Sequence, residues 1–337
     1  MVTSAFDPVL GAVALSETSD PCTDARCDFR RTGTLDLAGG GRSGVATYEG
    51  LSGTAIDLEY SADGSLFAAI ATQQFESSLS AALWRGAAGD STGPTLLDLG
   101  VIGSDPAPPR APGWQYSAVM FSPDGSRLYA SGLGPTVVLD TASGEELHRI
   151  PGNGILAISP DGHLIAVRDG LRAVRIVHTS GVAAPLTVTL QSFPSVADFS
   201  PDGSQLAIAA DTGVLLANTQ TGAVVETLRA HDGWVTAVVF RPTGELVTAG
   251  EDGALITWDT GDWSARFPSD LFITDQMVAE LDERTVTLEQ SDGRWQQVVA
   301  EPAVWEERAC LIAGRGLNEQ EWGELMGARP YAPACPE

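Results

Sequence analysis

The pentapeptide Phe199-Ser-Pro-Asp-Gly203 decides the fold, because copies of it recur along the chain. Near and weaker copies begin at Tyr60 (Ser-Ala-Asp-Gly follows), Phe121, Ile158 and Phe240 (Arg-Pro-Thr-Gly follows), and segments beginning at Phe6 and Phe272 fit the same slot. Neighbouring copies in the middle of the chain lie about 40 residues apart, the period at which four-stranded units repeat. The sequence is therefore organised as seven similar units.

Each unit contains four short apolar segments separated by turn residues. An alternating segment such as Trp234–Phe240 leads into the Pro-Asp-Gly or Pro-Thr-Gly turn, where Pro fixes φ and Gly accepts a positive φ. Later segments of a unit are Leu206–Ala209, Val214–Ala217 and Val224–Leu228. Four strands per unit without a helical period are typical of a propeller blade, so the sequence predicts an all-β, seven-bladed propeller over residues 1–300.

The unit from Ala230 to Asp259 resembles the WD-repeat family of β-propellers. This resemblance implies a hydrogen-bonded tetrad that fixes neighbouring strands, formed by His231, Thr248, Asp252 and Trp258. A buried His and a buried Trp each need a polar partner, which Thr and Asp can supply. The other units lack the full set: Asp211 is present in the fifth, but Asn218 occupies its Trp position.

Residues 301–337 depart from the repeat, and their apolar spacing after Pro302 predicts a short α-helical C-terminal tail. The tail contains Trp305, Cys310, Gly314-Arg315-Gly316-Leu317-Asn318, Trp322 and Cys335-Pro336. In these residues it resembles the segment that follows WD-repeat propellers in bacterial signal-transducing NTPases of the STAND class. This resemblance implies that the chain is the sensor end of a longer regulator, with an effector domain upstream of Met1. We further expect the tail to close the ring by packing Trp305 and Trp322 across it.

The four cysteines form two pairs along the chain, Cys22 with Cys27 and Cys310 with Cys335. A Cys310–Cys335 disulfide would staple the tail and contribute about 3 kcal/mol by chain entropy. Four reduced thiols are the alternative that a cytoplasmic protein would favour. The sequence predicts no metal site, because the C-x4-C spacing has no second pair at ligand distance.

Composition excludes several classes of function. All 19 basic residues are Arg against 44 Asp and Glu, a net charge of -25, which argues against nucleic-acid or anionic-membrane binding. Without Lys there is no Walker A site. The longest apolar run, Leu66–Ala71, is far too short for a membrane span, and Met1–Glu17 lacks the basic region of a signal peptide. We expect a cytoplasmic protein without a cofactor, and no catalytic motif occurs.

Three long insertions, residues 16–28, 72–79 and 104–115, map to one sector of one propeller face. The last is rich in Pro and would present Arg110 and Trp114, although loops tolerate insertions without any function. Together with Trp234, these two residues are the candidates for binding a partner.

The leading interpretation is a non-enzymatic interaction module, the WD-repeat sensor of a larger bacterial signal-transduction or defence regulator. It would bind a neutral or basic protein or peptide on its loop-rich face. Two alternatives stay open: a carbohydrate- or small-molecule-binding or enzymatic propeller, and a TolB-like extracytoplasmic propeller, which also carries Ser-Pro-Asp-Gly repeats.

Overall fold

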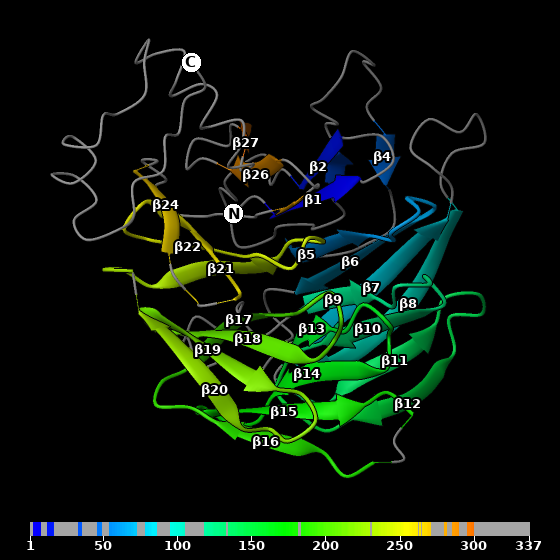
Figure 1. The fold of residues 1–337 in the computed structure, drawn as a ribbon. Helices are drawn as coiled ribbons and strands as arrows, with labels where there is room; N and C mark the ends of the chain where they lie inside the picture. The colour runs from blue at the N-terminus through cyan, green and yellow to red at the C-terminus, as the bar shows by residue number, and fades with distance from the viewer. Residues whose placement is uncertain are drawn as a thin grey trace, which may run out of the picture.

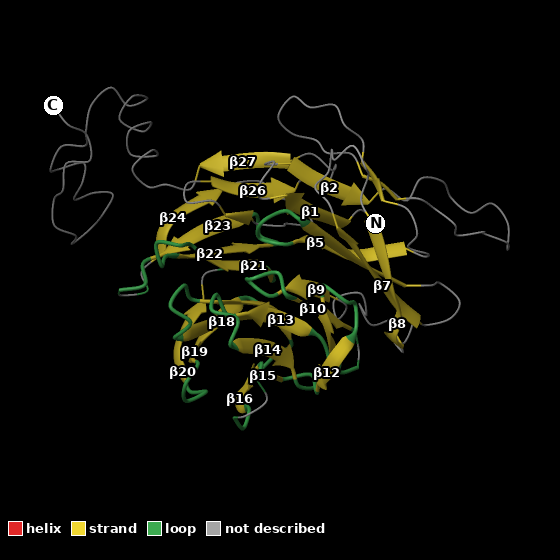
Figure 2. Cartoon of the chain, turned by 90° about the vertical axis from the view of Figure 1, so that its right-hand side faces the viewer, coloured by secondary structure: helices red, strands yellow, loops and turns green. Residues whose placement is uncertain are grey.

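The structure is a computed structural model of the chain. It describes residues 54–72, 78–85, 95–104 and 118–270, the last with gaps at 133, 181–182, 230, 262 and 264, and short strands near both chain ends. All regular secondary structure in these residues is β-strand, and none is helical (Figure 2). The all-β prediction is confirmed for them. The C-terminal tail, residues 301–337, lies outside the described residues.

Five antiparallel sheets have four strands each, in chain order across the sheet. The first contains β5 (Thr54–Tyr60), β6 (Leu66–Thr72), β7 (Ser78–Arg85) and β8 (Thr95–Ser104). The second contains β9 (Ala118–Phe121), β10 (Arg127–Ser131), β11 (Thr136–Asp140) and β12 (Glu146–Ile150). The third contains β13 (Ile155–Ile158), β14 (Leu164–Arg168), β15 (Ala173–His178) and β16 (Leu186–Thr189).

The remaining sheets complete the series. The fourth four-stranded sheet contains β17 (Pro194–Phe199), β18 (Gln205–Ala210), β19 (Gly213–Asn218) and β20 (Val224–Arg229). The fifth contains β21 (Val235–Phe240), β22 (Leu246–Gly250), β23 (Ala254–Trp258) and β24 (Ala265–Asp270). Smaller sheets pair β1 (Thr3–Asp7) with β2 (Ala12–Ser16), β3 (Gly33–Leu35) with β4 (Ala46–Tyr48), and β25 (Glu280–Leu281), β26 (Thr285–Glu289) and β27 (Trp295–Val299).

Successive sheets meet through their first strands. Strands β1, β5, β9, β13, β17 and β21 follow one another in contact, while the fourth strands β8, β12, β16 and β20 lie at the rim (Figure 1). Four-stranded antiparallel sheets arranged with their first strands innermost are consistent with a β-propeller. The count of seven blades stays a prediction, because the smaller sheets at the chain ends do not show complete four-stranded units.

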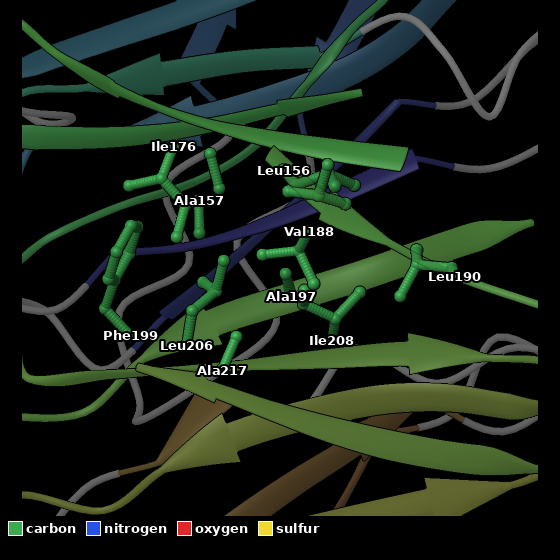
Figure 3. Packing of buried hydrophobic residues seen from close by; sticks show 12 residues of the cluster. Leu156, Ala157, Ile176, Val188, Leu190, Ala197, Phe199, Leu206, Ile208 and Ala217 are labelled. Carbon is green, nitrogen blue, oxygen red and sulfur yellow. The ribbon is translucent and has the colours of Figure 1, made fainter. Parts of the chain in front are cut away.

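The core lies between neighbouring sheets, and one part of it is drawn in Figure 3. There Val174, Ile176 and Val188 of one sheet pack against Phe199 and Ile208 of the next, and all five are buried. Since each sheet is covered on both faces, its second strand is apolar almost throughout: β22 is buried at every position. The fourth strands are more exposed than the second strands: four of the five residues of β12 are exposed.

The repeated pentapeptide forms the turn between the first and second strands. In the turn after β17, the Ser200 hydroxyl donates to Asp202 Oδ1 at 2.7 Å and accepts from the Gln205 amide at 2.9 Å. Gly203 has a φ of 68°, a conformation that only glycine adopts without strain. These bonds hold the pKa of Asp202 below its usual value, chiefly through the Ser200 hydroxyl and then the Ser204 amide. Asp202 therefore stabilises the turn by accepting hydrogen bonds from residues of the same turn.

Candidate functional site

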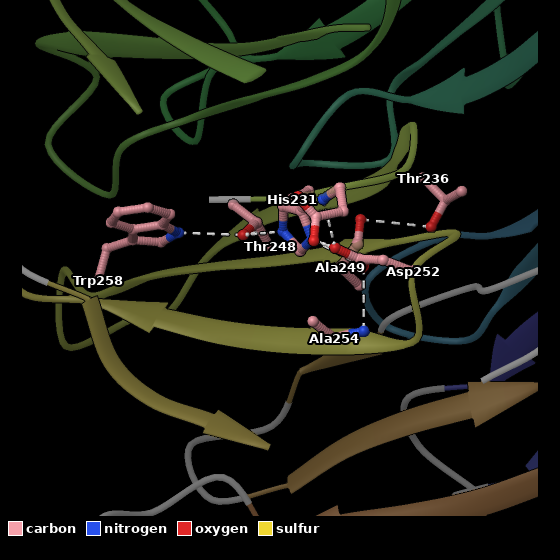
Figure 4. A network of polar contacts seen from close by, with 8 residues as sticks. His231, Thr236, Thr248, Ala249, Asp252, Ala254 and Trp258 are labelled. Carbon is pink, nitrogen blue, oxygen red and sulfur yellow. Dashed lines mark hydrogen bonds and ion pairs between the residues drawn. The ribbon is translucent and has the colours of Figure 1, made fainter. Parts of the chain in front are cut away.

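The fifth four-stranded sheet carries a hydrogen-bonded chain of side chains, drawn in Figure 4. His231 precedes β21, Thr248 lies in β22, Asp252 lies in the turn after β22, and Trp258 ends β23. The Trp258 Nε1 donates to Thr248 Oγ1 at 3.0 Å, and Thr248 Oγ1 lies 2.8 Å from His231 Nε2. His231 Nδ1 lies 3.1 Å from Asp252 Oδ1. The structure therefore brings together the four residues that the WD-repeat resemblance implies.

One arrangement of protons satisfies the side-chain polar groups of His231, Thr248, Asp252 and Trp258. Because His231 Nδ1 faces a carboxylate, that nitrogen carries the proton and donates. The Thr248 hydroxyl can then donate to His231 Nε2 while its oxygen accepts from Trp258. This assignment leaves none of these buried ring nitrogens without a partner, which is the condition for burying them at low cost.

Asp252 is the last of these four hydrogen-bonded side chains, and it also binds two backbone amides. Its carboxylate accepts from the amides of Asp232, at 2.7 Å, and Ala254, at 3.1 Å, as well as from His231. Burial disfavours its charged form, but the bonds from Ala254, His231 and Asp232 outweigh burial and lower the pKa of Asp252. Asp252 thus ties the loop before β21 to the turn between β22 and β23.

Two glycines let this loop and turn approach each other. A Cβ at Gly250 would lie 2.6 Å from His231 Nδ1 and 2.7 Å from Asp252 Oδ1, closer than real Cβ contacts. A Cβ at Gly233 would lie 2.7 Å from the amide nitrogen of Asp252. A larger residue at Gly250 would displace the side chains of His231 and Asp252, and one at Gly233 would displace the backbone of Asp252.

A hydroxyl, an imidazole and a carboxylate in this order also form the triad of serine hydrolases. Here, however, Thr248 is fully buried and its oxygen already receives the Trp258 N–H. A nucleophile must be reached by its substrate, and this oxygen is covered. His231, Thr248, Asp252 and Trp258 therefore stabilise the sheet, and we call these four residues the brace.

An exposed aromatic residue, Trp234, follows His231 of the brace by three positions. This residue is 54% exposed, although the indole is among the largest apolar groups of the chain. Its carbonyl accepts from the Glu251 amide at 2.8 Å, and the next amide, Val235, donates to the carbonyl of Asp211 at 2.9 Å. Trp234 is thus held between the turn of its own sheet and the turn of the preceding sheet.

Acidic residues flank this tryptophan. Asp211, Asp232 and Glu251 belong to the three backbone segments that meet at Trp234, and all three are exposed. We call these four residues the Trp234 face. An exposed indole beside carboxylates is chemically suited to the cationic or apolar groups of a partner.

The other sequence candidates lie elsewhere. Arg110 and Trp114 lie outside the described residues, so the structure does not relate them to Trp234. Cys22, Cys27, Cys310 and Cys335 also lie outside the described residues. Among the residues that are described, no group of His, Cys, Asp and Glu could hold a metal ion, and no helix is long and apolar enough to span a membrane.

Sequence reasoning missed the polar side chains that join successive sheets. The Ser131 hydroxyl accepts from the Ile155 amide at 3.0 Å, and buried Arg168 donates to the carbonyls of Pro194, at 3.0 Å, and Ser195, at 2.7 Å. The remaining two junctions between four-stranded sheets are joined by Asp57 and Asp198. A polar residue inside an apolar strand was the available indication.

Comparison with known proteins agrees with this geometry. The family described as WD domain, G-beta repeat, matches residues 222–259, which include the whole brace. An uncharacterized WD repeat-containing protein of Synechocystis sp. is 28% identical over 155 residues, or 44% of this chain and 42% of that protein. The match therefore spans less than half the length of this relative. Both similarities support a WD-repeat protein.

Proposed function

We propose that this chain is a non-enzymatic module that binds a protein or peptide through the Trp234 face. One observation carries the proposal: Trp234 is 54% exposed, and the backbone that presents it is held by hydrogen bonds on both sides, from the Glu251 amide to the Trp234 carbonyl and from the Val235 amide to the Asp211 carbonyl. Rigid, exposed aromatic side chains supply large contact areas at little entropic cost, and Trp is enriched among residues that dominate binding energy.

The charge of the face selects the partner. Asp211, Asp232 and Glu251 add local negative potential to a chain of net charge -25. A neutral or basic segment is attracted to such a surface, and salt weakens the attraction by screening it. Nucleic acid and anionic membranes are repelled, and no cofactor is required for this role.

We infer a wider context from the resemblance of the tail: a cytoplasmic bacterial regulator of the STAND class, whose upstream effector domain this module restrains or releases. The gene's reading frame upstream of the first codon tests this context. An NTPase or kinase domain in that frame supports it, whereas a secretion signal there overturns it.

A displayed peptide library tests the binding proposal. Peptides selected on the chain should be enriched in Arg and Lys and should bind Trp234→Ala at least tenfold more weakly, the loss typical of a central aromatic anchor. The matched control is Val225→Ala, which removes another exposed apolar side chain, 52% exposed, from the rim strand β20. Equal binding to both variants, or selected peptides that are acidic, would contradict the proposal.

A further inference from the structure

Two aspartates inside first strands each reach across to the next sheet. Asp57 Oδ2 of β5 accepts from the Val119 amide of β9 at 2.8 Å, and Asp198 Oδ2 of β17 accepts from the Phe240 amide of β21 at 2.6 Å. The first strand of each sheet has a ladder partner on one side only. The amides of that strand that face away from the ladder need other acceptors when they are buried, and Asp57 and Asp198 supply one at two of the four junctions.

The strands in most extensive contact with β5 and β17 carry no cation. Strands β13, β18 and β21 pack against β17, and none of the three carries a titratable side chain. Strands β1, β6 and β9 pack against β5, and their only titratable residue is Asp7. On β5 itself the titratable neighbours are Glu59 and Tyr60. Two buried arginines lie near the junction of Asp198: Arg168 of β14 donates to the carbonyls of Pro194 and Ser195, and Arg241, which follows Phe240, pairs with Glu245 at 3.0 Å.

This setting determines which protonation state is favoured. Burial raises the pKa of Asp57 and of Asp198 from 3.8 to about 7, although the amides of Val119 and Phe240 each lower it in part. Both aspartates are half-buried, and a carboxyl that loses water contacts without a hydrogen-bonded cation favours its neutral form. Both groups therefore change charge near neutral pH, far above the ordinary range of Asp.

We propose that Asp57 and Asp198 are proton-sensitive clasps between successive sheets, which stabilise their junctions when the carboxyl is neutral and destabilise them when it ionises. The inference is independent of the proposed function, since neither residue belongs to the Trp234 face.

The direction of the pH dependence follows from linkage. The folded chain binds these protons more tightly than the unfolded chain does, so their stabilisation is complete below about pH 4 and is lost as pH rises through about 7. With 3.8 for the unfolded state and about 7 for the folded state, each clasp can raise the unfolding constant up to about a hundredfold between pH 5 and pH 8.

Unfolding constants of Asp198→Asn at pH 5 and pH 8 provide the first test. The amide keeps an oxygen acceptor for Phe240 but cannot ionise, so the variant should be more stable than the parent chain at pH 8 and should lose part of the pH dependence. Asp202→Asn is the matched control: it makes the same chemical substitution four residues away, at an exposed carboxyl whose pKa is lowered. Equal pH profiles for the two variants would overturn the proposal.

The second test follows single backbone amides of the parent chain and of one variant. The amide signal of Phe240 in a ¹H–¹⁵N spectrum of the full chain should shift with pH with a midpoint near 7, because its acceptor changes charge. The Val119 amide should shift in the same range, and Asp57→Asn should abolish that shift alone. Amides of Phe240 and Val119 that do not respond between pH 5 and pH 8 would overturn the proposal.

Discussion

Thr248→Val tests the brace, because it removes one oxygen and leaves the shape of the side chain nearly unchanged. In the parent chain this oxygen accepts from Trp258 Nε1 at 3.0 Å and lies 2.8 Å from His231 Nε2. Valine can satisfy neither nitrogen. Since Thr248 is fully buried and Trp258 is only 5% exposed, water does not replace the lost partner.

The expected magnitude follows from the two groups left unpaired. Each buried polar group without a partner costs about 1–3 kcal/mol, so Thr248→Val should lower the free energy of unfolding by about 2–6 kcal/mol. For a chain of 337 residues the melting temperature should fall by about 3–8 °C. Thermal and denaturant unfolding followed by circular dichroism measure both quantities.

Thr248→Ser is the control, because it keeps the hydroxyl and loses only a methyl group, a change of about 1 kcal/mol. A double-mutant cycle with Trp258→Phe isolates the shared bond: once the indole N–H is gone, Thr248→Val should cost less. Valine and serine variants of equal stability, or strictly additive effects in the cycle, would refute the reasoning that the hydroxyl is the centre of the brace.

Further substitutions test other parts of the structure. Gly250→Ala should destabilise the chain by about 2–4 kcal/mol, because its Cβ would overlap the ring of His231, and chemical denaturation would show this as a lower midpoint. Arg168→Met should cost about 1–3 kcal/mol in the same assay, because two carbonyls at the start of β17 lose their donor. The pKa of Asp124 is lowered to about 2 by the Ser122 hydroxyl and the Ser126 amide and hydroxyl, so its stabilisation is present above about pH 4 and lost as pH falls toward 2. Asp124→Asn should therefore reduce stability at pH 6 and leave it unchanged at pH 2, and the same loss at both pH values would count against this assignment.

The repeated turns could be predicted from the sequence because their determinants are local. Pro and Gly fix the backbone of each Pro-Asp-Gly turn, and the apolar runs beside it mark strands buried on both faces. The sequence predicts a second strand over Leu206–Ala209, and the structure has β18 at Gln205–Ala210. Strand boundaries thus follow from the pattern to within a residue here.

The brace could be proposed only by resemblance, since its four residues span 28 positions and no spacing rule joins them. The contacts between sheets could not be predicted from the sequence even by resemblance. Asp57 and Asp198 occupy different positions within their repeats, and each bonds to a strand about 40 or more residues away, so no repeat pattern relates them. Which amide each carboxyl meets depends on how two sheets sit against each other, and this is a property of the assembled fold.

The central claim, that a partner docks on the Trp234 face, is tested most directly by amide hydrogen exchange with and without a selected peptide. Protection is expected in residues 231–235 and 251–253 and in the turn at Asp211, with no change in the rim strand β20. Protection confined to β20, or spread evenly over the sheets, would contradict the claim.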